Sequence, residues 1–202
     1  VRASGVITWY VNGSAETTRT NSGNINGIGN LTFGSYPGGV GGYNGWLKDV
    51  RIINGTAVYT SDFSVPTAAH GGNGAPTVTT AQGGFVDLAR NHGVRTAGTA
   101  AVNTSIKKFG TSSLFVDGNS DYAAIADDSF AFNTRDFTVE AWVYHTGVSG
   151  SSNIFDFRKS SDGFTINMDT SGNVGYYSNK AGDYVIGQGS NSIGTNSWKH
   201  LV

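Results

Sequence analysis

The feature that most constrains the fold is an alternation of apolar and polar residues in short runs, which turn residues separate. Successive side chains of a β-strand point to opposite faces, so this pattern predicts strands that are buried on one face. Dipeptides such as Asn12-Gly13 and Asp117-Gly118 supply the backbone conformations that tight turns require. Strands are therefore expected at Val6–Asn12, Asn30–Ser35, Gly45–Ile53, Ser113–Val116, Tyr122–Ile125, Phe137–Tyr144, Ile154–Arg158, Gly163–Met168, Val174–Ser178 and Trp198–Val202.

Helical spacing of apolar residues is not sustained anywhere in the sequence. The chain of 202 residues has 30 Gly, only 3 Pro and 12% aromatic residues, which is typical of short strands joined by many turns. Apolar residues make up 38%, too many for a disordered chain. The fold class expected from this pattern is an all-β antiparallel sandwich.

Charge and cysteine content exclude several functions. The net charge is −1 with 13% charged residues, so there is no basic stripe for nucleic acid. No apolar run is long enough to insert into a membrane. The sequence has no Cys, which excludes disulfides, thiolate metal sites and a Cys nucleophile.

Two stretches resemble a known family. FGTSSLFVDGNSDYAAIADDSFAFNTRDFTVEAWVY (109–144) resembles the opening half of a laminin G-like, concanavalin A-type jelly roll, with Phe-x-Gly-x-x-Asp-Tyr followed by a Phe-Thr-x-Glu-x-Trp strand. NLTFGSYPGGVGGYNGWLKDVRIINGTAVYTSDFSVPT (30–67) is similar to the closing half, with Leu-Thr-Phe-Gly and an Asp-x-Arg-Ile strand. Both stretches resemble the form of this domain found in phage virion and bacterial surface proteins more than the form found in animal laminins.

The halves stand in the reverse of the family order. In the family a Trp-x-His-Leu/Val strand lies midway and leads into a strand that ends Tyr-Val-Asn-Gly. Here Trp198–Val202 comes last and Val6–Gly13 first, so writing residue 202 before residue 1 restores the junction. The chain is either one repeat or piece of a longer protein, which we favour, or a circular permutant. We expect the two halves to share one sandwich, within or between chains, because a half jelly roll leaves sheet edges open.

The domain organisation follows from this resemblance. Residues 1–68 are expected to be the C-terminal half of a laminin G-like jelly roll and residues 85–202 the N-terminal half. Residues 69–84 are small and polar, which is typical of a linker.

The resemblance implies a non-catalytic structural or adhesion module, extracellular or on a virion surface, as part of a longer fibre, tail or decoration protein. The expected partners are other copies of the chain, other virion or surface proteins, and a cell-surface glycan, with no nucleic acid. The alternative is a lectin-type carbohydrate-binding module of a larger secreted enzyme.

A glucanase is disfavoured, although jelly rolls of this type include glucanases. Retaining glycosidases need two carboxylates about 5–5.5 Å apart. The only Glu residues are Glu16 and Glu140, and the neighbours of Glu140 on its strand face are Thr138 and Trp142. We therefore expect no enzyme activity and no catalytic residues.

Two groups of residues are candidate binding sites. Glu140, Trp142 and Tyr144 share one face of a predicted strand, and a carboxylate beside aromatic rings is typical of a sugar-binding face; the alternative is packing under a neighbouring loop. Asp117, Asn119 and Asp121 place oxygen ligands at alternating positions of a tight loop, as Ca²⁺ requires. The alternative there is a turn held by Asx hydrogen bonds.

Overall fold

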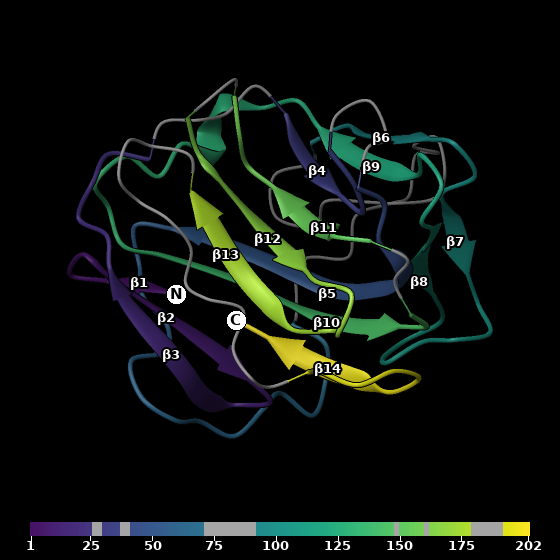
Figure 1. Cartoon of the computed structure of the whole chain (residues 1–202), viewed down its shortest axis with the longest axis horizontal. Coiled ribbons are helices and arrows are strands. Elements are labelled where there is room, and N and C mark those ends of the chain that lie inside the picture. Colours follow the sequence, from purple (N-terminus) through teal and green to yellow (C-terminus); the bar gives the residue numbers. More distant parts are fainter. Residues whose placement is uncertain (26–29, 37–40, 71–91, 148–149, 160–161, 179–191) are drawn as a thin grey trace.

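The protein is a sandwich of two antiparallel sheets (Figure 1). The computed structural model describes residues 1–25, 30–36, 41–70, 92–147, 150–159, 162–178 and 192–202. The strands are β1 (Arg2–Ala3), β2 (Val6–Val11), β3 (Ser14–Thr20), β4 (Leu31–Phe33), β5 (Asn44–Asn54), β6 (Val94–Ala97), β7 (Ala101–Asn103), β8 (Ser113–Asp117), β9 (Tyr122–Ile125), β10 (Phe137–His145), β11 (Ser152–Asp156), β12 (Phe164–Met168), β13 (Val174–Ser178) and β14 (Trp198–Leu201).

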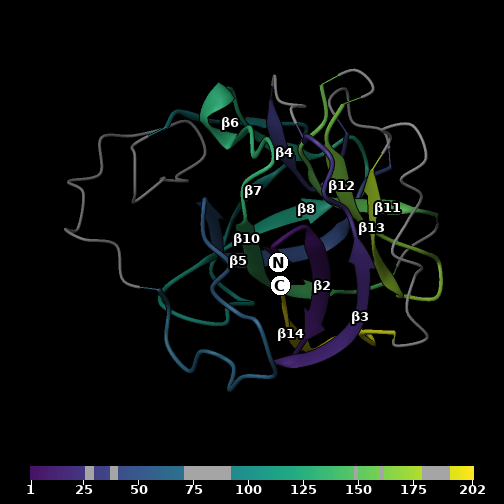
Figure 2. The ribbon, with the colours of Figure 1, turned by 90° about the vertical axis from the view of Figure 1, so that its left-hand side faces the viewer.

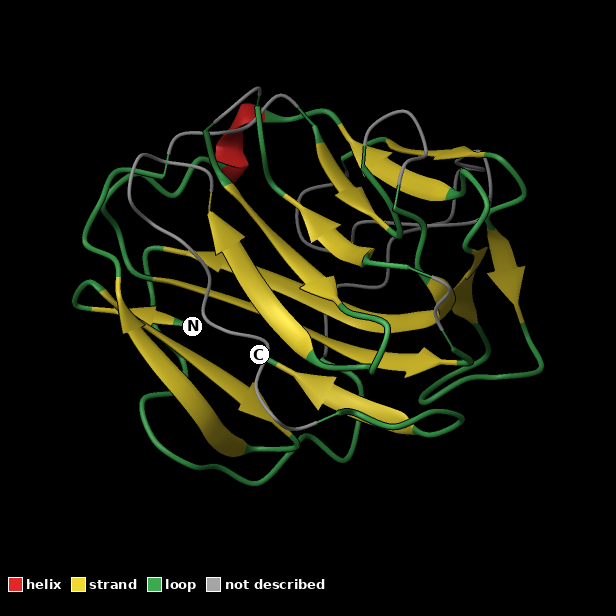
Figure 3. Cartoon of the chain, viewed as in Figure 1, coloured by secondary structure: helices red, strands yellow, loops and turns green. Residues whose placement is uncertain are grey.

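The described residues are almost entirely strands and loops, with one helical turn at Asp128–Phe130 (Figure 3). Every predicted strand is present, with its ends within two residues of the expected positions. The prediction of an all-β jelly-roll sandwich is confirmed. Among the described residues, no helix has the length and apolar character that crossing a membrane would take.

Strands from residues 1–68 and from residues 85–202 contribute to both sheets. The first sheet has the order β3-β2-β14-β10-β5-β8-β7, with β1 bonded to both β2 and β10. The second has the order β13-β12-β11-β4-β9-β6. Most of the predicted linker, residues 71–84, lies outside the described residues.

The first and last residues lie end to end between β2 and β10 (Figures 1 and 2). The backbone of Val202 exchanges hydrogen bonds of 3.0 and 3.1 Å with Tyr10. Val1 likewise accepts the N–H of Thr8 at 2.8 Å and donates to its carbonyl at 2.9 Å. One strand position of the sheet is thus occupied by β14 followed by β1.

The core lies between the sheets and is formed by alternate residues of the strands. The inner residues of β10 are Phe137, Val139, Ala141 and Val143, all buried. They pack on aromatic rings of the second sheet, which include Phe155, Phe157, Phe164 and Tyr176. The opposite face of β10, which carries Glu140, points away from the second sheet; we call this side of the first sheet the outer face.

Replacing Phe164 by Ala should lower the free energy of unfolding by about 3–5 kcal/mol, because a buried ring is removed and a cavity remains. Phe164 is 1% exposed, and its ring lies 4.6 Å from that of Phe157 and 4.9 Å from that of Tyr176. Denaturant unfolding measures this change. Val6→Thr at a 38% exposed position is the control and should change stability by less than about 0.5 kcal/mol.

Candidate functional site

A β-bulge in β5 gives the outer face its charged pair. Strand pairing places Lys48 opposite Trp142 but Arg51 opposite Glu140, so one extra residue is inserted in β5. Asp49 lies at the bulge with a φ of 55°, a conformation that Asp tolerates better than most residues. The bulge reverses the alternation of β5, which turns Arg51 to the outer face beside Glu140.

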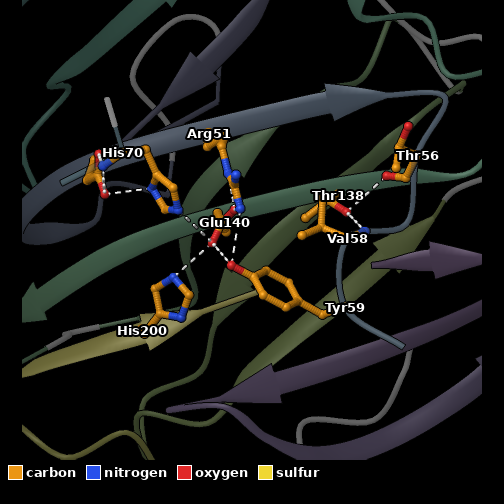
Figure 4. A network of polar contacts seen from close by, with 9 residues as sticks. Arg51, Thr56, Val58, Tyr59, His70, Thr138, Glu140 and His200 are labelled. Atoms are coloured by element: carbon orange, nitrogen blue, oxygen red, sulfur yellow. Dashed lines mark hydrogen bonds and ion pairs between the residues drawn. The ribbon is translucent and has the colours of Figure 1, made fainter. Parts of the chain in front are cut away.

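Glu140 is the centre of a polar network on the outer face (Figure 4). Its side chain is fully buried and forms an ion pair with Arg51. Tyr59 donates its hydroxyl to Oε2 at 3.1 Å, and Nε2 of His200 lies 3.1 Å from the same oxygen. Nε2 of His70 is more distant, at 3.8 Å. These partners supply the compensation that a buried carboxylate needs.

Residues 55–70, which we call the crossing segment, cover this network. The N–H of Val58 donates to Oγ1 of Thr138 at 2.9 Å, and that hydroxyl donates to the carbonyl of Thr56 at 3.1 Å. At the far end, Nδ1 of His70 lies 2.8 Å from Oδ2 of Asp49. The segment is thus fastened to both β10 and β5.

The middle of the crossing segment packs on the β2–β3 turn. Phe63 stacks on Tyr59 with ring centroids 3.8 Å apart and meets Tyr10 edge-on at 5.5 Å. Its N–H donates to the carbonyl of Gly13 at 2.9 Å. Gly13 has a φ of 84°, and a Cβ there would lie 2.0 Å from the carbonyl oxygen of Phe63, so only glycine permits this approach.

The network shifts the pKa values of two of its members. Burial alone would raise the pKa of Glu140, but the contact with His200 and the charge of Arg51 outweigh it, so that the pKa lies below its ordinary value. Burial, followed by the charge of Glu140, raises the pKa of Tyr59 to about 12. The carboxylate and the neutral phenol are therefore the forms that stabilise the fold.

Burial of Glu140 and Trp142 corrects the expectation of an open sugar-binding face at these residues. Trp142 is 3% exposed. Its ring lies 5.7 Å from that of Phe109 and 5.1 Å from that of His200, and Nζ of Lys108 stands 3.9 Å above it. Distant segments of the chain fold over this part of β10. This agrees with the alternative given above for these residues, which was packing under a neighbouring loop.

Tyr144, the third predicted residue, is partly exposed and belongs to a row of four aromatic side chains. The rings follow one another across four neighbouring strands of the outer face, with centroids 5.6, 5.3 and 4.9 Å apart. All four are partly exposed. We call this set the aromatic row; in strand order it consists of Trp198, Tyr144, Trp46 and Phe115.

The predicted cation ligands form a closed turn. Asp121 is 0% exposed and accepts the N–H groups of Thr99 and Asp117. Asp117 accepts the N–H of Asn119 at 2.7 Å and the hydroxyl of Thr99. These two hydrogen bonds hold the pKa of Asp117 below its usual range. Because the carboxylates already accept hydrogen bonds from donors of the protein, we expect this turn to be held without a calcium ion, which takes six to eight oxygen ligands. No group of three or more potential metal ligands occurs in the described part of the chain.

The two Glu residues are far apart. Glu16 lies on β3 at the sheet edge, and β2 and β14 separate it from Glu140 on β10. With strands about 4.8 Å apart, this gives a separation of about 14 Å, beyond the range of either glycosidase geometry. Asp49 is nearer to Glu140, but the imidazole of His70 stands between the two carboxylates.

The sequence did not predict the partners of Glu140 in this network, which are Arg51, Tyr59, His70 and His200. The alternation of β5 pointed Arg51 to the other face, and nothing local places Tyr59 or His70 over β10. His200 had a signal, because it is the His of the Trp-x-His motif beside β10.

The two-sheet architecture defines the class as a jelly-roll β-sandwich. Residues 117–202 match the family model described as the concanavalin A-like lectin/glucanase superfamily, so this part of the chain is similar to that superfamily. The chain has no significant match among curated proteins or solved structures.

Glu140→Gln should weaken the acid dependence of stability. The lowered pKa of Glu140 gives stability that is present above about pH 4.5 and lost as pH falls through the folded-state value. The variant should have a smaller free energy of unfolding at pH 7, by up to about 3 kcal/mol, and a shallower loss below pH 4.5. Denaturant unfolding at several pH values between about 3 and 7 measures both the stability at neutral pH and its loss in acid.

Glu16→Gln is the matched control, since Glu16 lies on the exposed edge strand β3. It should retain the acid dependence of the wild-type protein. An acid limb in Glu140→Gln as steep as in the wild type would contradict the role given to this carboxylate.

Calcium should leave the Tm unchanged, because the donors of the Asp117–Asp121 loop are already engaged. Thermal unfolding in the presence of Ca²⁺ and of EDTA measures this. A rise in Tm with Ca²⁺ that Asp121→Asn abolishes would show that the loop binds the ion.

Proposed function

We propose that the protein is a non-catalytic carbohydrate-binding and adhesion module of an extracellular or virion structural protein. The match of residues 117–202 to the lectin/glucanase superfamily supports glycan recognition in general. The resemblance to phage virion and bacterial surface proteins supports a place in a fibre, tail or decoration protein. Its partners are then a surface glycan and neighbouring structural proteins, including copies of the chain.

The observation that carries this proposal is the aromatic row. Sugar rings bind to aromatic side chains through their apolar C–H faces, and partly exposed rings on a rigid sheet offer such area at little entropic cost. Trp46 meets Phe115 at an interplanar angle of 38° and Tyr144 at 89°. The rings therefore brace one another and present a surface of mixed faces and edges.

The state of Glu140 supports a non-catalytic role. A general acid or nucleophile must reach the glycosidic bond, whereas this carboxylate is enclosed by Arg51, Tyr59 and His200 under the crossing segment. Glu16, on β3, is too distant to act with it. The carboxylate has a structural role instead.

Substitution of Trp46, Tyr144 or Trp198 by Ala should weaken glycan binding by about 3- to 10-fold each, the effect of losing one stacked ring. The measurement is a glycan array followed by titration calorimetry with the best polysaccharide. Tyr36→Ala, a partly exposed aromatic that packs on Arg158 elsewhere, is the control and should bind normally. Absence of binding to every glycan, or equal binding by all variants, would refute the proposal.

A further inference from the structure

We infer that the aromatic row binds an acidic glycan, whose carboxylate or sulfate groups lie against Lys48 and Lys108. This inference rests on the proposed function, because it specifies which glycans the row selects. The aromatic rings alone offer apolar area and do not distinguish neutral from charged sugars. The discrimination has to come from the charges beside them.

Lys48 lies beside the aromatic row on the same face. It follows Trp46 by two residues on β5, before the bulge, and therefore shares its face. The side chain is partly exposed, and its Nζ lies beside Gly110. The ammonium group thus reaches over the outer face toward the segment that carries Lys108.

Lys108 borders the row from the loop before β8. Its Nζ lies 3.9 Å from the ring centroid of Trp142, which precedes Tyr144 by two residues on the same face of β10. The ring of Trp142 is held between Phe109 and His200, so this cation–π contact fixes the ammonium group in place. Lys48 and Trp142 are opposite each other in the strand register, which brings both lysines to one side of the row.

The positive charge on this side of the row is not neutralised by the described part of the protein. Neither Lys48 nor Lys108 forms an ion pair with a carboxylate among the described residues. The nearest acidic groups on β5 and β10 are engaged elsewhere, Asp49 with His70 and Glu140 with Arg51.

The opposite side of the row has the opposite character. Asp117 follows Phe115 by two residues on β8, and its carboxylate accepts hydrogen bonds from Asn119 and Thr99. The charge across the row is therefore asymmetric. An acidic sugar would place its anionic group on the lysine side and its ring on the aromatic side chains.

The test compares matched pairs of polysaccharides at low salt: polygalacturonate with its methyl ester, and dextran sulfate with dextran. The wild-type protein should bind an acidic form about tenfold more tightly than its neutral partner. Binding by polygalacturonate alone or by dextran sulfate alone assigns the anion as carboxylate or sulfate. Lys48→Gln and Lys108→Gln should each lose most of this preference.

Lys107→Gln is the matched control. It removes the same charge from the adjacent residue, whose Nζ donates to the carbonyl of Thr104. Its binding should equal that of the wild type. Polyglutamate tests for general attraction of polyanions and should bind weakly and independently of Trp46.

The inference is overturned if neutral and acidic forms bind alike, if Lys107→Gln is as harmful as Lys48→Gln, or if polyglutamate binds as tightly as the acidic glycans. Binding of the acidic glycans that depends on Trp46 and not on the lysines would overturn this inference and leave the proposed function standing. Absence of binding to every glycan by the wild-type protein would overturn both this inference and the proposed function.

Discussion

The charge of Glu140 has to be compensated inside the protein, and the arrangement of the outer face depends on this requirement. Burying an ionised carboxylate costs several kcal/mol unless partners surround it. Those partners come from three places: Arg51 from β5, His200 from β14 and Tyr59 from the crossing segment. A single carboxylate thus joins segments that are distant in the chain to the middle strand of the first sheet.

This requirement divides the outer face into two parts. One part, around Glu140, is polar and is covered by the crossing segment, and the carboxylate itself is buried. The other, around Tyr144, remains partly open and is lined by aromatic rings and two lysines. The enclosed part makes a rigid base for the open one, because Trp142 packs against His200 and carries Lys108 on its ring. A binding surface on such a base requires little ordering when a ligand arrives.

Local pattern predicted much of the fold, and long-range contacts account for what it did not. Alternation located most of the strands that pack on the core. The short strands β1, β6 and β7 were not predicted, and neither was β3, whose sequence SAETTRT has no apolar alternation. An edge strand needs little apolar surface, since the hairpin at Asn12-Gly13 is sufficient to pair it. The bulge at Asp49 reversed the faces of β5, and the cover over Glu140 came from residues about eighty positions away. Neither the bulge nor this long-range cover can be predicted from the local alternation of apolar and polar residues.

The position of β10 between β5 and β14 has a consequence for how the chain folds. Arg51 and Glu140 are 89 residues apart, and the contact between Asn12 and His200 spans 188. Closing such loops costs entropy before any contact compensates for it, and folds dominated by non-local pairs form slowly. The strands of residues 1–68 cannot complete a sheet by themselves, since β2 and β5 are not neighbours. We therefore expect the first sheet to form only once β10 is in place, because β10 lies between β14 and β5.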